Sequence, residues 1–244
     1  MAADIEWHRG RLAAFDIETT GPEPERDRIV TAAISLVGGG VEPKHGAWLV
    51  NPGVEISAGA IAVHGVTNER ARADGCAPGE AVEEIVSLLA TQVRDDVPIV
   101  AFNARFDLTI LDREARRHGV EPLVDRVGGP DELLAIDPYV LDKQFDRFRK
   151  GKRTLTAVCD HYAIPFDEAH VANADALAAA RVAFRLATRM QELRDLDLRT
   201  LHREQVMWAA RQAVLLEEYF QAQGRQERVQ GAWPVVPAQL AVAA

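Results

Sequence analysis

Residues 11–50, RLAAFDIETTGPEPERDRIVTAAISLVGGGVEPKHGAWLV, indicate three strands that follow one another with only short connections. The apolar runs that define these strands cover residues 11–17, 28–37 and 41–50. Gly38-Gly39-Gly40 is typical of a hairpin turn between the second and third strands, and Asn51-Pro52-Gly53 ends the third. Consecutive strands joined in this way predict an antiparallel meander.

From residue 78 onward the pattern alternates between helices and strands. Residues 78–93 repeat apolar side chains at helical spacing, with Val82, Ile85, Val86 and Leu89 on one face. The further elements predicted are strands at 98–102 and 132–136 and helices at 103–119, 154–162 and 175–193. Such an alternation adds parallel strands to the meander, so we expect an α/β fold: a mixed sheet with flanking helices.

The last fifty or so residues have a different character. A long helix is predicted from about residue 196 to residue 223, with Leu201, Trp208 and Leu215 spaced by seven. Such a stripe usually packs within its own chain, although it could also bind a polymerase or form a dimer. We therefore predict two parts, residues 1–195 and a helical C-terminal extension over residues 196–244.

Composition narrows the class of protein. The formal net charge of −9 argues against a surface that wraps nucleic acid. The charge is compatible with an enzyme that binds a nucleic-acid strand only at its active site, because a cluster of carboxylates attracts phosphate once it has bound divalent cations. No run approaches the roughly 18 apolar residues of a membrane span, and the N-terminus lacks the apolar core of a signal peptide, so we predict a cytoplasmic protein. Cys76 and Cys159 are isolated, and we expect two buried or partly buried thiols.

The first strand ends with two carboxylates, Asp16 and Glu18. Because side chains alternate along a strand, both project to one face while Ile17 projects to the other. An acidic strand end is common and by itself points to a solvated edge. Here, however, Phe15 and Ile17 flank the acids with apolar bulk, and Thr19-Thr20-Gly21 follows as a turn that can approach a ligand closely.

Two further acids begin helices. Asp107 falls in the first turn of the helix that Asn103 is placed to cap, and Asp175 falls in the first turn of a helix that Asn173 could cap. The helix dipole favours an acid at either position in any protein. His170, five residues before Asp175, taken alone would be a surface histidine. Together, four carboxylates on three elements with a histidine form a more specific constellation.

Three segments resemble the exonuclease motifs of DnaQ-like DEDDh enzymes, in the same order and at similar spacing, over roughly residues 8–192. They are Phe15-Asp16-Ile17-Glu18-Thr19-Thr20-Gly21, Asn103-Ala104-Arg105-Phe106-Asp107 and His170-Val171-Ala172-Asn173-Ala174-Asp175. That group includes the proofreading epsilon subunit of bacterial DNA polymerase III. The resemblance implies a ribonuclease H-like fold, which agrees with the meander and parallel strands predicted from the residues.

The resemblance also implies roles for particular side chains. Asp16, Glu18, Asp107 and Asp175 would bind two divalent metal ions, Mg²⁺ or Mn²⁺, and His170 would be the general base. Carboxylate oxygens suit these hard cations. Two such ions can stabilise both the attacking and the leaving oxygen of a phosphodiester, and histidine can accept a proton near neutral pH. The implied products are 5′-mononucleotides and a strand with a free 3′-OH.

Substrate contacts are predicted at three places. The backbone of Thr19, Thr20 and Gly21 would contact the terminal nucleotide. Val63-His64-Gly65-Val66-Thr67 resembles a family segment near the substrate 3′ end, so Val63, His64 and Val66 are candidates to pack on its base, with a plain loop core as the alternative. Asn103 and Phe106 could position Asp107 or touch the strand. Many relatives have histidine where this chain has Phe102, which could alter the support around Asp107.

The densest basic run comprises Arg147, Arg149, Lys150, Lys152 and Arg153, with Phe148 among them. In an acidic protein it is typical of a loop that follows phosphates, and we predict strand binding by Arg149, Lys150 and Lys152. A solvated loop is the alternative interpretation.

These observations favour a 3′→5′ exonuclease that acts on single-stranded or frayed 3′ ends of DNA in proofreading or repair, with a DNA polymerase as a possible partner. An RNA 3′→5′ exonuclease is a close alternative, because no residue identified here decides whether a 2′-OH is tolerated. A non-catalytic scaffold subunit on the same fold is a second alternative, and the complete set of acids argues against it.

Overall fold

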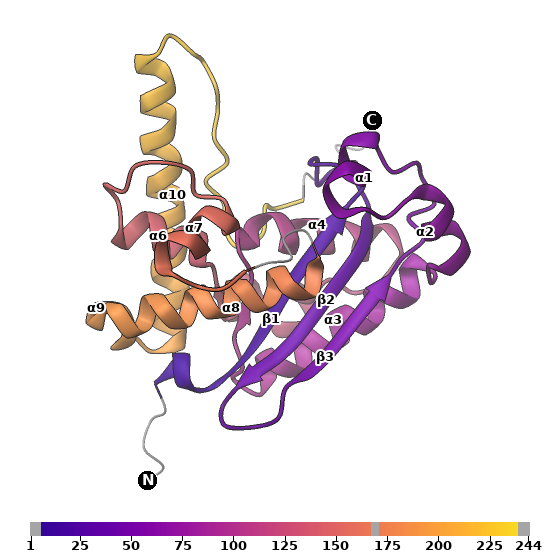
Figure 1. Ribbon diagram of the computed structural model, residues 1–244, viewed down its shortest axis with the longest axis horizontal. Coiled ribbons are helices and arrows are strands. Elements are labelled where there is room, and N and C mark those ends of the chain that lie inside the picture. Colours follow the sequence, from indigo (N-terminus) through magenta and orange to yellow (C-terminus); the bar gives the residue numbers. More distant parts are fainter. Residues whose placement is uncertain (1–5, 167–170, 239–244) are drawn as a thin grey trace.

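The computed structural model describes residues 6–166 and 171–238 and is built around a five-stranded mixed sheet (Figure 1). The strand order is β3-β2-β1-β4-β5: β1, β2 and β3 form an antiparallel meander, and β4 and β5 are added parallel to β1. The strands are β1 (Arg11–Thr19), β2 (Ile29–Gly38), β3 (Lys44–Leu49), β4 (Ile99–Val100) and β5 (Ala135–Ile136). The predicted α/β fold with a mixed sheet is therefore confirmed.

Side-chain alternation along β1 separates the two halves of the core. Leu12 and Ala14 belong to the apolar cluster that includes α8 (Ala172–Arg189). Phe15 and Ile17 belong to the cluster that includes α3 (Pro78–Arg94) and α4 (Ala104–Arg117). Helices thus cover both faces of the sheet, and the face that carries Leu12 and Ala14 continues to Asp16 and Glu18.

The helix predicted at 78–93 is confirmed by α3, whose predicted apolar positions are all buried. Several short helices were not predicted, because five to eight residues give too little periodicity to distinguish a helix from a loop. They are α1 (Ala58–His64), α2 (Asn68–Asp74), α5 (Leu123–Val127) and α6 (Pro138–Phe145). The helix expected at 154–162 is α7 (Leu155–Tyr162), and the one expected at 175–193 begins earlier and is divided into α8 and α9 (Gln191–Arg194).

The structure also bears on the predictions about the two cysteines and about membrane-spanning segments. Cys159 is buried, as predicted, whereas Cys76 is exposed, so the expectation of two buried or partly buried thiols was wrong for Cys76. None of the helices in the described parts of the chain is long and apolar enough to cross a membrane.

The long helix α10 (Leu198–Ala222) closes one edge of the sheet. The Ala135 N–H of β5 donates to His202 Nδ1 at 3.0 Å, and the Asp137 N–H donates to Gln205 Oε1 at 2.7 Å. Gln205 Nε2 donates back to the Ala135 carbonyl at 3.0 Å. Two side chains of α10 therefore satisfy the backbone groups that an edge strand would otherwise leave unpaired. The division of the chain at residue 195 stays a prediction.

Replacing Gln205 with leucine should destabilise the protein by about 1–3 kcal/mol, because the buried Asp137 N–H loses its acceptor. Gln212→Leu on the same helix is the matched control, since the hydrogen bond from Gln212 to the Val140 carbonyl is only partly buried. Urea unfolding of both variants would measure the difference. Equal losses of stability in the two variants would contradict a specific role for the Gln205 contact.

Candidate active site

Three carboxylates meet at the end of β1. Asp16 and Glu18 lie on the face of β1 that α8 covers, and Asp175 lies in the first turn of α8. One oxygen of each carboxylate lies within 4.8 Å of the others. Strand alternation and the packing of α8 on β1 are thus sufficient to bring these side chains together.

Asp107 joins them from the other helical layer. It lies in the first turn of α4, which follows β4, and its side chain is almost fully buried. Asp107 Oδ1 accepts a hydrogen bond from the Ile17 N–H at 3.1 Å, which ties the start of α4 to the strand between Asp16 and Glu18. All four predicted carboxylates line one hollow of about 480 Å³.

The cluster is electrostatically unfavourable when all its members are ionised. Burial, followed by the nearby charges of Asp107, Asp175 and Glu18, raises the pKa of Asp16 well above its usual value. Burial also raises the pKa of Asp107, and burial together with Asp175 raises the pKa of Glu18 to about 7. Converging hard oxygen donors that repel one another fit a divalent cation such as Mg²⁺ or Mn²⁺.

This electrostatic strain predicts a pH dependence for the metal-free protein. The folded state keeps the Glu18 proton up to about pH 7, whereas the unfolded chain loses it near 4.5, so the stability due to this group falls as pH rises between those values. In EDTA, Glu18→Gln should therefore raise the melting temperature by roughly 3–6 °C at about pH 8 and have little effect at about pH 4. Glu42→Gln, at an exposed carboxylate, is the control. A difference that does not change with pH, measured by calorimetry, would contradict the prediction.

Asp137 supports the site and was not predicted. It lies directly after β5, and its two oxygens accept the N–H groups of Asn103 and Ala104 at 2.9 and 3.0 Å. Trp233 Nε1 also donates to it, at 3.2 Å. Burial raises the pKa of Asp137 to about 6, against the opposing effect of these donors. Asp137 therefore caps α4 from a different strand and holds the helix that carries Asp107.

The expectation that Asn103 caps α4 with its side chain was wrong. Asn103 adopts a left-handed conformation, with φ 65° and ψ 44°, and its side chain makes no capping hydrogen bond. Asparagine tolerates this conformation better than most residues. Because Asp137 satisfies the backbone, the Asn103 side chain is left at the wall of the hollow, together with Phe102 and Phe106.

The expectation that Asn173 caps α8 was also wrong. The helix begins at Ala172 after Val171, with no side-chain cap. Instead, Asn173 Oδ1 accepts a hydrogen bond from Ser35 Oγ on β2 at 2.7 Å, and Ser35 Oγ also lies 2.8 Å from His45 Nδ1 on β3. Asn173 thus anchors the start of α8 to the sheet. His170, predicted as the general base, lies outside the described residues.

The turn after β1 is held by its own side chains. Thr19 Oγ1 donates to the Gly21 carbonyl at 2.6 Å, and Thr20 Oγ1 donates to Asp27 Oδ1 at 2.7 Å. A Cβ atom on Gly21 would lie 2.7 Å from the Asp27 carboxylate, so a larger residue here would displace the side chain that Thr20 contacts. Both threonine side chains are buried, which leaves the backbone of the turn as the part able to contact a substrate.

The segment with Val63, His64 and Val66 lies next to this turn. The Ser57 N–H, at the start of α1, donates to the Thr20 carbonyl at 3.3 Å. Val63 is half-exposed on α1, whereas Val66 is buried in a small apolar cluster. His64 Nδ1 accepts the Val66 N–H at 3.1 Å. None of these three side chains lines the carboxylate hollow, and Val63 has the exposure that packing on a base requires.

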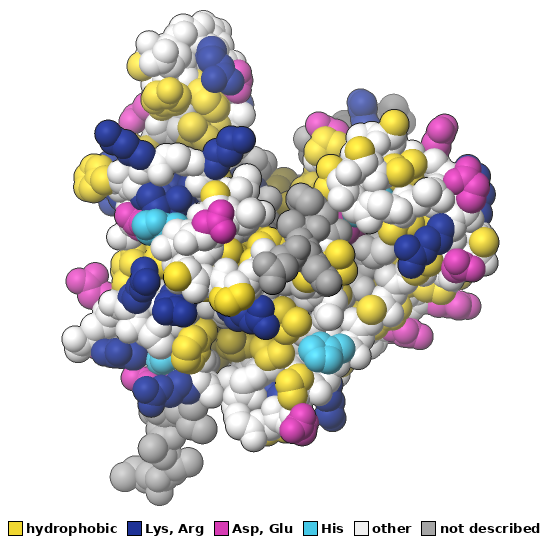
Figure 2. All heavy atoms as spheres, in the orientation of Figure 1, with side chains coloured by type: hydrophobic (Ala, Val, Ile, Leu, Met, Phe, Trp, Pro, Cys, Tyr) yellow, Lys and Arg dark blue, Asp and Glu magenta, His cyan; other side chains and the backbone are white. Residues whose placement is uncertain are grey.

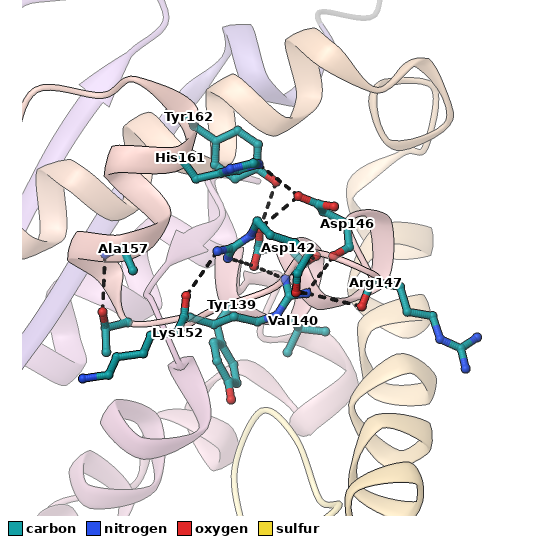
Figure 3. A network of polar contacts seen from close by, with 12 residues as sticks. Tyr139, Val140, Asp142, Asp146, Arg147, Lys152, Ala157, His161 and Tyr162 are labelled. Atoms are coloured by element: carbon teal, nitrogen blue, oxygen red, sulfur yellow. Dashed lines mark hydrogen bonds and ion pairs between the residues drawn. The ribbon is translucent and has the colours of Figure 1, made fainter.

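In the basic loop, residues 147–153, some cations form ion pairs within the protein and others are exposed. Asp142 of α6 is fully buried and binds Arg149 Nη2 at 2.7 Å, Tyr162 Oη at 2.9 Å and the Arg153 guanidinium (Figure 3). Arg149 is therefore engaged in holding the loop. Lys150 and Lys152 are exposed, and the phosphate-binding prediction rests on these two. Tyr139 of α6 and Arg153 were not predicted as site residues, and both line the carboxylate hollow.

Comparison with known proteins shows that the chain matches an exonuclease family. A family model for exonucleases, RNase_T, matches residues 13–183. Among curated proteins, the chain is similar to the PolC-type DNA polymerase III of Streptococcus sanguinis, with 26% identity over 184 residues, and of Staphylococcus aureus, with 26% identity over 191 residues. The alignments cover 74% and 78% of this chain but only 11% and 12% of those proteins. The chain thus spans about a tenth of the length of these polymerases.

Solved structures give the same result for the fold. Exonuclease I of E. coli, in complex with a dA16 oligonucleotide, aligns with a TM-score of 0.64 at 22% identity and covers 76% of this chain and 42% of that one. Exonuclease I of Methylocaldum szegediense aligns with a TM-score of 0.59 at 22% identity, over 86% of this chain and 45% of that one. This likeness confirms the ribonuclease H-like arrangement of the sheet and its flanking helices.

Proposed function

Because that family model covers most of the chain, the chain belongs to the RNase_T exonuclease family, of the DnaQ-like type, and we propose that it removes single nucleotides from the 3′ end of single-stranded or frayed DNA. The observation that supports this proposal most strongly is the convergence of Asp16, Glu18, Asp107 and Asp175 in one hollow at the end of β1. These four side chains come from three separate elements, and within residues 6–166 and 171–238 no ion pair explains why Asp16, Glu18 and Asp107 are held so close together.

The four carboxylates would hold two divalent cations, Mg²⁺ or Mn²⁺. When bound, such cations neutralise the charge that develops on a phosphodiester and stabilise the attacking and leaving oxygens. His170 would accept the proton of the attacking water. The water oxygen bonds to phosphorus and the bond to the neighbouring 3′ oxygen breaks, which gives a 5′-mononucleotide and a shortened strand that ends in 3′-OH.

The remaining residues of the hollow position the strand. Phe102, Phe106 and Leu155 give it apolar surface that suits a nucleotide base or sugar and excludes water. Phe102 packs edge-on against Tyr139, with 5.7 Å between ring centroids, and this pair supports the wall beside Asp107. The exposed backbone after Thr20 would contact the terminal nucleotide.

The similarity to a segment of PolC-type DNA polymerases supports a role in proofreading or repair, with a DNA polymerase as the partner. The match to the exonuclease family model ends at residue 183, so the partner could bind through the matched segment or through the part of the chain that follows it. Size-exclusion chromatography of the purified chain with a polymerase would test this association.

The proposed activity is tested with a single-stranded DNA labelled at its 5′ end and with the RNA of the same sequence. In Mg²⁺ the DNA should shorten through a ladder of products, and EDTA should abolish the reaction. Faster degradation of the RNA would change the substrate class to RNA. If neither strand shortens under metal-replete conditions, the proposal of an exonuclease active on single strands is wrong.

A further inference from the structure

A cationic groove lies beside the carboxylate hollow, between α6 and α10. Its volume is about 320 Å³, and none of its lining residues is acidic. We call it the α6–α10 groove. Its lining side chains include Lys143, Arg147, Arg153, Arg211 and Tyr219. Four cations around one hollow are notable in a chain whose formal net charge is −9.

Three of these cations make no ion pair with a carboxylate among the described residues: Lys143, Arg147 and Arg211. Lys143 instead lies 4.9 Å from the centroid of the Tyr139 ring, and Arg147 lies 5.6 Å from that of Phe148. Burial, and then the charges of Arg153 and Arg105, lower the pKa of Lys143, so like charges are crowded here. An anionic ligand would relieve that repulsion.

Arg153 differs from the other three, because the buried Asp142 fixes its position. In Figure 3 the Arg147 side chain points away from the Asp142 network. On the face shown in Figure 2, Lys and Arg side chains gather mainly over the half that holds α6, α7 and α10, whereas Asp and Glu gather more over the half with α1 and α2. The cations of the groove are thus part of a wider asymmetry of charge.

The groove adjoins the site. Arg153 lines both the groove and the carboxylate hollow, so the two share a wall. Across the groove, α10 contributes Arg211 and the half-exposed ring of Tyr219. Because α10 begins at Leu198, after the last residue matched by the exonuclease family model, this wall is supplied by a part of the chain outside the matched segment.

We propose that the α6–α10 groove binds the part of a single strand that lies 5′ of the nucleotide being removed. Phosphates contact Lys143, Arg147 and Arg211, and a base stacks on Tyr219. A cationic track with an aromatic side chain is the combination by which proteins bind single strands without reading their sequence. The proposal rests on the proposed exonuclease function, and it gives the C-terminal extension a role in substrate binding.

The test compares a trinucleotide with a strand of about 16 nucleotides, for the wild-type chain and for Arg147→Ala combined with Arg211→Ala. The long strand should bind about 10-fold or more weakly to the variant, and the slope of binding against salt should fall by roughly 0.7 for each lost contact. Turnover of the trinucleotide should stay unchanged. Tyr219→Ala should weaken long-strand binding by about 5- to 150-fold.

Arg203→Ala is the matched control, because Arg203 is exposed on the same helix and does not line the groove. Arg211→Lys should restore most of the binding that Arg211→Ala loses. Equal effects of Arg203→Ala and Arg211→Ala, or equal losses on short and long strands, would overturn the proposal. Strand binding is read by fluorescence anisotropy in Ca²⁺ as well as by turnover. If the wild-type chain binds the long strand through these residues but does not cleave it, the proposed exonuclease function is wrong and the proposed binding groove stands.

Discussion

Asp107→Asn should reduce turnover by at least about 10³-fold while the protein remains folded. Asparagine keeps the volume of the side chain and an oxygen that can accept the Ile17 N–H, so the contact between α4 and β1 can persist. The substitution removes one negative charge from the cluster that would hold the cations. Asp16→Asn should have an effect of similar size, because Asp16 lies among the other three carboxylates.

Circular dichroism and a gel assay under single-turnover conditions would measure these outcomes. Asp160→Asn is the control, since Asp160 is exposed on α7 and does not line the hollow. In EDTA, neither Asp16→Asn nor Asp107→Asn should be less stable than wild type, because each loses a carboxylate whose pKa is raised. Near-wild-type cleavage by both folded variants would show that this hollow is not the catalytic centre.

His170→Ala should reduce turnover by about 10²–10⁴-fold, the usual contribution of general acid–base catalysis. The prediction rests on the position of His170, five residues before Asp175, in the segment that resembles the third exonuclease motif. Binding of the metal and of the strand should be retained, because a base that accepts a proton from water need not bind either. Added imidazole should restore part of the lost turnover.

His118→Ala is the control, because His118 is an exposed residue at the end of α4. A His170→Ala variant with near-wild-type turnover would show that another group accepts the proton. The assignment to the DEDDh group would then be wrong, while the four-carboxylate site would remain to be judged by the Asp16 and Asp107 variants.

The parts of the fold that could be predicted are those in which side chains repeat at the regular spacing of a strand or a helix. The alternation at Asp16, Ile17 and Glu18 was sufficient to place two carboxylates on one face, and the structure confirms that face by the burial of Ile17 in the opposite layer. The meander and α3 were predicted for the same reason. Where the chain forms helices of only seven or eight residues, as at 58–74 and 138–145, the period is too short to detect.

The support of the site depends on partners far away in the sequence, and these could not be predicted. Asn103 and Asn173 were both predicted to cap helices with their side chains. Instead, Asp137 accepts the backbone N–H of Asn103 at the start of α4, and the Asn173 side chain accepts a hydrogen bond from Ser35 on β2. Arg149 looked like a phosphate contact but binds the buried Asp142. A polar residue next to a helix start has several possible partners, and the tertiary structure decides among them.

The most direct test of the central claim follows one single strand of DNA that carries distinguishable labels at its two ends. In a single turnover with Mg²⁺, the 3′ label should appear first and as a 5′-mononucleotide, while the 5′ label should remain on a strand shortened by one nucleotide. Release of the 5′ label first, or release of the 3′ label on a fragment longer than one nucleotide, would contradict the assignment of a 3′→5′ exonuclease.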